Sequence, residues 1–133
     1  MGDRAAVSVS RARIFAVVGL VLALGGCGYD PATDEAAAQL AYRRGFEALN
    51  AGDWLKAQQY LIQAKQAFPE DPYVLLNLGV VSQRLGRFDE ARRYFQQVVD
   101  LAPDDVPEHV TDPNLAGRSL EDLARMALAT LPN

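Results

Sequence analysis

The chain repeats itself at an interval of 34 residues, and this feature limits its fold more than any other. When residues 38–71 are laid over residues 72–105, glycines, a proline and several apolar residues coincide. The matched pairs are Gly45 with Gly79, Gly52 with Gly86, Trp54 with Phe88, Ala57 with Ala91, Tyr60 with Tyr94, Leu61 with Phe95, and Pro69 with Pro103. A period of this length indicates one supersecondary unit that stacks on a copy of itself.

Each unit predicts two helices joined by a short turn. In the second unit, apolar and small residues recur at helical spacing from Asp71-Pro72 to Leu85, and Gly86 then ends the first helix. A second apolar stripe follows, made of Phe88, Ala91, Phe95, Val98 and Ala102. Gly45 and Gly79 are expected where the two helices of a unit cross, because a larger side chain would push them apart. The prolines at 69 and 103 end the second helices, since proline lacks the N–H that a helix needs.

The period and its residues resemble the tetratricopeptide repeat, an antiparallel helix–turn–helix unit. The second copy carries the pattern more fully, whereas the first departs from it at Ala41 and Arg44, where bulkier apolar residues are usual. This resemblance implies an all-α fold, a short solenoid of two repeats at residues 38–71 and 72–105.

In proteins similar to this one, the first helix of each repeat lines a concave groove that holds an extended or helical peptide. Asn77 stands where such proteins often use an amide to hold the peptide backbone. The resemblance therefore implies a partner-binding groove formed by Tyr42, Arg43, Phe46, Tyr73, Leu76, Asn77, Val80 and Arg84.

Two repeats alone leave one hydrophobic end of the stack uncovered, so a closing element is required. Residues 106–118 are rich in turn formers and predict a loop. Residues 119–131 then begin with a capping-box-like Ser119 and carry one apolar stripe, which predicts a capping helix. This helix has two alternative places: beside an open groove, or over Phe46, Leu76 and Val80.

The amino-terminal segment predicts export. Three arginines precede an apolar run at residues 14–24, which is too short to span a bilayer by itself. The run ends in Leu24-Gly25-Gly26-Cys27, which resembles the lipobox of bacterial lipoproteins. The resemblance implies a signal peptide at residues 1–26, a lipid on Cys27 and a tether at residues 27–34, with the helix starting at Asp34. The alternative is that Cys27 is incidental, after an ordinary cleavage site.

The composition of the chain excludes several kinds of binding site. The chain has 13 Lys and Arg against 17 Asp and Glu, a formal net charge of −4, which excludes a general nucleic-acid binder. One Cys and one His exclude an intramolecular disulfide and a Cys/His zinc site, and we expect no cofactor or metal. His109 lies in the predicted loop beside Glu108, and we expect no catalytic role for it. Four arginines, at 84, 87, 92 and 93, form either a solvated face or a site for an acidic partner or a lipid phosphate.

Together these features predict a lipid-anchored protein–protein interaction module of the bacterial cell envelope, an adaptor or assembly factor with no chemistry of its own. Its partners would be envelope proteins, and its membrane contact would be the lipid. Gly28, in place of Asp, points to the outer membrane, with the domain facing the periplasm. In size and layout the chain looks like small repeat lipoproteins of pilus assembly (the TadD-like group) or pilotins. The alternative is an enzyme, or its accessory subunit, acting on cell wall or polysaccharide.

Overall fold

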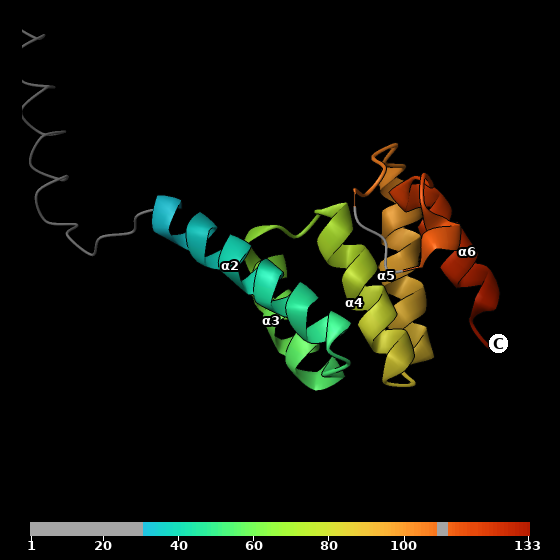
Figure 1. Cartoon of the computed structure of the whole chain (residues 1–133), viewed down its shortest axis with the longest axis horizontal. Helices are drawn as coiled ribbons and strands as arrows, with labels where there is room; N and C mark the ends of the chain where they lie inside the picture. The colour runs from blue at the N-terminus through green and yellow to red at the C-terminus, as the bar shows by residue number, and fades with distance from the viewer. Residues whose placement is uncertain (1–30, 109–111) are drawn as a thin grey trace, which may run out of the picture. The chain divides into compact units, whose positions relative to one another are not determined.

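The computed structural model describes residues 31–108 and 112–133, and within these ranges the regular elements are all helical. They are α2 (Pro31–Asn50), α3 (Trp54–Ala67), α4 (Pro72–Arg84), α5 (Phe88–Leu101), a 3-10 helix η1 (Pro113–Leu115) and α6 (Leu120–Thr130). Figure 1 shows α2 to α6 following one another across the domain. The main contacts join α2 with α3, α3 with α4, α4 with α5, and α5 with α6. The predicted short all-α solenoid is confirmed.

The turns within the repeats form at the predicted glycines. Gly52 and Gly86 have φ of 76° and 73°, in the left-handed region that favours glycine. Aspartates begin α3 and α4: the Asp53 side chain accepts the Lys56 N–H at 3.3 Å. The Asp71 side chain accepts two N–H groups, from Tyr73 and Val74, at 2.9 and 3.0 Å. These side-chain caps fix the residues at which α3 and α4 begin.

The two helices of each repeat cross closely at its first glycine, as predicted. A Cβ atom built on Gly45 would lie 2.8 Å from Leu61 Cγ, and one built on Gly79 would overlap the ring of Phe95. Leu61 and Phe95 are themselves matched positions of the repeat. A glycine in the first helix thus makes room for the largest core side chain of the second.

The core consists of two clusters that share α4. The first joins Leu61 and small residues of repeat one to one face of α4, through Val74, Leu78 and Val81. The second joins Leu75, on the other face of α4, to α5 and α6. In that cluster Phe95 and Leu120 are fully buried. Helix α4 is therefore the central element, and α6 covers the end of repeat two as predicted.

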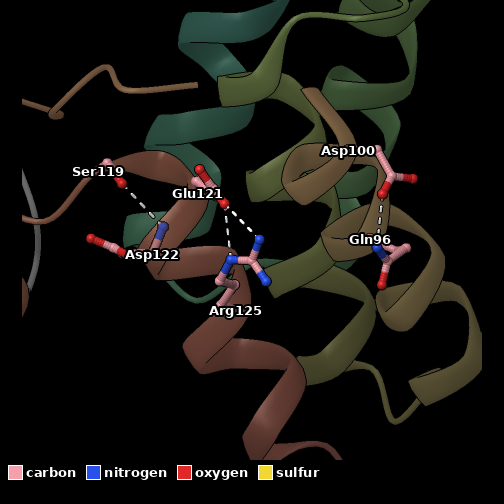
Figure 2. Close-up of polar contacts among 6 residues, drawn as sticks. All are labelled: Gln96, Asp100, Ser119, Glu121, Asp122 and Arg125. Atoms are coloured by element: carbon pink, nitrogen blue, oxygen red, sulfur yellow. Dashed lines mark hydrogen bonds and ion pairs between the residues drawn. The ribbon is translucent and has the colours of Figure 1, made fainter. Parts of the chain in front are cut away.

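Local hydrogen bonds hold the start of α6 (Figure 2). Ser119 Oγ accepts the Asp122 N–H at 3.1 Å, and Glu121 pairs with Arg125 at 2.7 Å, one turn apart. The Leu120 N–H donates to the Asp105 carbonyl oxygen at 2.9 Å, which ties the helix to the segment after repeat two. The predicted capping motif at Ser119 is therefore formed, and it begins the helix at the predicted place.

Three boundaries differ from the sequence expectation. Helix α2 begins at Pro31 rather than Asp34, because proline is favoured in a first helical turn, so residues 31–34 of the predicted tether are helical. The stripe of α5 is shorter than expected: Phe88 is 38% exposed, and Ala102 ends the helix with a left-handed φ of 46°. The predicted loop at residues 106–118 contains η1.

Several predictions lie outside the described residues. The signal peptide, Cys27 and the first part of the tether fall within residues 1–30, and His109 falls within residues 109–111. In the part of the chain that the structure describes, no helix combines the length and the apolar character that crossing a membrane requires.

Candidate partner-binding groove

One open groove, with a volume of about 1670 Å³, is lined by α2, α4 and α6. All eight residues that the sequence assigned to the groove line it: Tyr42, Arg43, Phe46, Tyr73, Leu76, Asn77, Val80 and Arg84. They come together because α2 and α4 occupy equivalent positions in successive repeats. Side chains one period apart, such as Phe46 and Val80, therefore line the same surface.

Helix α6 adds a wall to this groove. Its residues Leu123, Met126, Ala127 and Thr130 line the side opposite α2, and Val106, Pro107 and Leu115 of the preceding segment also contribute. Leu76 and Val80 pack partly against the cluster that includes α6, yet both still line the groove. Of the two alternatives for the capping helix, the structure supports a wall beside an open groove rather than a cover over it.

A hydrogen bond crosses from one repeat to the other inside the groove. The Asn77 Nδ2 atom donates to the Tyr42 hydroxyl at 3.3 Å. Burial raises the pKa of Tyr42, and the negative charge of Asp71 raises it further. The amide that was predicted to hold a peptide backbone thus has a partner within the protein, and its side-chain orientation is set by Tyr42.

The groove also contains a residue that the sequence analysis did not assign to it. Trp54, at the start of α3, lines the groove, and the Arg84 guanidinium lies over its ring, 5.5 Å from the centroid. Trp54 was interpreted only as a repeat position matched with Phe88. The sequence feature that could have assigned Trp54 to the groove is its large aromatic ring beside the turn at which the first helix ends.

The four arginines of the predicted basic cluster do not act together. Arg84 lies on Trp54, whereas Arg87 donates to Gln58 Oε1 at 2.9 Å. Arg92 pairs with Asp89 at 2.9 Å and donates to the Pro132 carbonyl oxygen at 2.8 Å. These separate contacts support the solvated-face interpretation over a single anion site.

The groove is acidic at the end where α4 begins. Glu108 lines it there and acts electrostatically on Tyr73, and Asp112 is a further acid of the groove lining. The pKa of Tyr73 is raised by burial first, and then by the charges of Asp105, Asp71 and Glu108. Within residues 31–108 and 112–133, no group of three or more His, Cys, Asp or Glu side chains has an arrangement that could hold a metal ion.

Comparison with known proteins agrees with the geometry. The tetratricopeptide repeat family model matches residues 48–110, from the end of α2 to beyond α5. Residues 48–110 thus form a tetratricopeptide repeat region. In tetratricopeptide repeat proteins the repeats serve as protein–protein interaction modules, and the open groove of this repeat protein is consistent with that use.

Three curated relatives are similar over most of this repeat protein. Cellulose synthase operon protein C of Komagataeibacter xylinus is 36% identical over 92 residues, which cover 69% of this chain. The protein of the same name from Komagataeibacter sucrofermentans is 35% identical over 92 residues. The alignment spans only 6% of the length of either relative, so the similarity concerns a small part of a much longer protein. No solved structure matches the chain.

Proposed function

We propose that this repeat protein is a lipid-anchored adaptor of the bacterial cell envelope that holds a segment of a partner protein in the groove between α2, α4 and α6. The observation that carries the proposal is the convergence of all eight predicted groove residues on one open surface. Its volume of about 1670 Å³ exceeds the roughly 300–1,000 Å³ typical of small-molecule pockets, which favours a polypeptide segment as the occupant.

The side chains of the groove suit protein recognition. Tyr42, Trp54 and Tyr73 offer large rings, and the Arg84 guanidinium already lies over the Trp54 ring. Tyr, Trp and Arg are the residues most enriched among those that dominate binding energy at protein interfaces. Because Asn77 holds Tyr42, and Arg84 lies over Trp54, these side chains lose less conformational entropy when a partner binds.

The finer assignments rest on the amino-terminal pattern. The lipobox-like Leu24-Gly25-Gly26-Cys27 supports a lipid on Cys27, and Gly28 favours the outer membrane over the inner. Two acyl chains anchor a protein stably to a membrane. A role in pilus or secretion-machine assembly follows only from the overall size and layout. Fatty-acid labelling of the wild type and of Cys27→Ser tests the anchor: unlabelled wild-type protein in the soluble periplasm would contradict it.

Site-specific photocrosslinking in native membranes tests the groove. A benzoylphenylalanine at Phe46 should form an adduct with the partner, whereas the same group at Ile62 should not. Ile62 is 42% exposed on α3 and does not line the groove. Adducts from Ile62 but not from Phe46 would contradict the proposal.

Groove substitutions extend this test. Tyr73→Ala and Arg84→Ala should each reduce partner capture about tenfold, which corresponds to about 1.4 kcal/mol. The melting temperature should change little, because neither side chain belongs to the fully buried core. Arg93→Ala is the matched control, since it removes an exposed arginine outside the groove. Arg92 is less suitable, because its contact with Pro132 holds the end of the chain after α6.

A second candidate function is an accessory role beside a polysaccharide synthase. It is favoured by the relatives, which are named cellulose synthase operon protein C. Deleting the gene and measuring extracellular polysaccharide tests this candidate, with Arg84→Ala at the chromosomal locus to ask whether the groove is needed. A hydrolase screen of the purified protein on cell-wall and polysaccharide substrates separates an accessory role from an enzymatic one.

A further inference from the structure

The two ends of the groove differ in charge. At the end where α4 begins, Tyr73 and Glu108 line the groove, and the charges of Asp105 and Glu108 act on this tyrosine. At the end where α4 finishes, Arg84 lies on Trp54. Arg43 and Glu47 of α2 also line the groove, and their opposite charges add no net charge to it. A partner segment in this groove would therefore meet a negative potential at one end and a positive charge at the other.

Among the described residues, the acids at this end of the groove form no ion pair. The ion pairs in that part of the chain involve Asp53, Glu90, Asp89 and Glu121, and none of these lines the groove. The carboxylates of Asp71 and Asp112 accept hydrogen bonds from uncharged amides, which leave their charge in place. The Asp105 backbone carbonyl accepts the Leu120 N–H. Within residues 31–108 and 112–133, the charges of Asp105, Asp71 and Glu108 therefore act on Tyr73 without being held in ion pairs.

Such an arrangement attracts a cation more strongly than the same acids would on an open surface. The low-dielectric walls of a cleft concentrate the field of the charges that line it. A guanidinium or ammonium group near the face of a tyrosine ring also gains from the negative charge of that face. The apolar side chains of Leu76 and Val80 then continue along α4, away from Tyr73.

We propose that the groove selects a partner segment in which an Arg or Lys docks on Tyr73 beside Asp105 and Glu108, while neighbouring apolar side chains lie along Leu76 and Val80 toward Phe46. This inference rests on the proposed function, since it names the chemistry of the segment that the groove holds. Charge complementarity distinguishes this occupant from an acidic peptide and from a second copy of this acidic chain.

The test uses peptides as probes. Random 12-residue peptides displayed on phage are selected against the full-length protein in detergent, and dissociation constants of the selected peptides are measured by fluorescence anisotropy. The selected sequences should carry an Arg or Lys next to apolar residues. Asp105→Asn/Glu108→Gln should raise the dissociation constant at least tenfold. Replacing the peptide's basic residue by Gln should have the same effect, and the two changes together should cost little more than either alone.

The matched control is Asp34→Asn/Asp122→Asn, which removes the same charge from exposed positions outside the groove. It should change the dissociation constant less than twofold. Circular dichroism of each variant checks that the fold is intact. One outcome would overturn this inference and leave the groove function standing. In it, the peptides lose affinity for the Phe46→Asp and Arg84→Ala variants, but they carry no basic residue or bind the Asp105/Glu108 variant normally. Peptides insensitive to both groove substitutions, or none selected, would overturn both. Displacement of the peptides by dimerisation, seen in light scattering, would assign the groove to a second copy instead.

Discussion

Repeat one and repeat two share the same register, yet the outer faces of their first helices are unlike. On α4, Val74, Leu78 and Val81 are almost fully buried against repeat one. The residues one period earlier on α2 are Leu40, Arg44 and Glu47, all exposed. The same three positions thus form a core in one repeat and a surface in the other.

The difference shows that the residues on the outer face of a repeat depend on the position of that repeat in the stack. An inner repeat must present an apolar face to its neighbour, whereas a terminal repeat needs a polar outer face. Arg44 meets this need, because its guanidinium lies over the Tyr60 ring, 5.9 Å from the centroid. The departure from the family pattern at Arg44 is therefore a terminal feature. The opposite end of the stack is apolar and is covered by α6.

Removing the cover from the apolar end should have the largest effect. Deletion of residues 119–133 exposes Leu75, Phe95 and Val98, and it removes Leu120 and Leu131 from the core. Because each buried leucine contributes roughly 1.5–3 kcal/mol, the loss should reach several kcal/mol or cause aggregation. Urea unfolding of the purified chain measures it. Leu40→Ala at the polar end is the comparison and should cost less than about 1 kcal/mol. An unchanged unfolding curve for the deletion would show that α6 adds little to the stack.

The second largest difference in stability is expected between substitutions at equivalent positions of the two repeats. Leu78→Ala leaves a cavity between the repeats and should cost about 2–5 kcal/mol. Arg44→Ala, one period earlier, removes only an exposed contact with Tyr60 and should stay within about 0.5 kcal/mol. Thermal melting followed by circular dichroism gives both values. Equal costs would mean that the outer face of α2 is covered in solution.

The two crossing glycines should respond differently to alanine. Gly79→Ala forces the new Cβ atom into the Phe95 ring, and overpacking of this kind costs about 1–3 kcal/mol. Gly45→Ala places its Cβ atom 2.8 Å from Leu61 Cγ, a less severe overlap than at Gly79, and the helix gains about 1 kcal/mol when alanine replaces glycine. Gly45→Ala should therefore cost less than Gly79→Ala in chemical denaturation. A larger loss for Gly45→Ala than for Gly79→Ala would refute this ordering.

The smallest expected effect concerns Tyr42, which stands one period before Leu76. Tyr42→Phe removes the hydrogen bond from Asn77 and should cost about 0.5–1.5 kcal/mol near neutral pH. The pKa of Tyr42 is raised in the folded state above its ordinary value of 10.0, mainly by burial. Ionisation therefore favours the unfolded chain, and the wild type should lose stability relative to Tyr42→Phe as the pH rises through about 10. A difference in melting temperature that does not vary with pH would contradict this reasoning.

Local patterns predicted the repeats well because each depends on neighbouring residues. Glycines with positive φ, aspartate caps and terminal prolines act within a few residues of the chain, so the turns at Gly52 and Gly86 followed directly from the sequence. The helix start at Pro31 was missed, because proline is compatible both with a tether and with a first helical turn.

By itself, the sequence determined the two-helix repeat, the glycine crossings and the eight residues that share the groove, because a fixed period places equivalent side chains on equivalent surfaces. Only the tertiary structure decided that α6 forms a wall of the groove, that Trp54 supports Arg84, and that Asp105 and Glu108 converge on Tyr73. These contacts join segments far apart in the chain. The contact between Trp54 and Arg84 depends on how the two repeats stack. The α6 wall and the acids near Tyr73 depend on how the irregular segment after α5 returns to the stack, and a local pattern does not encode that path.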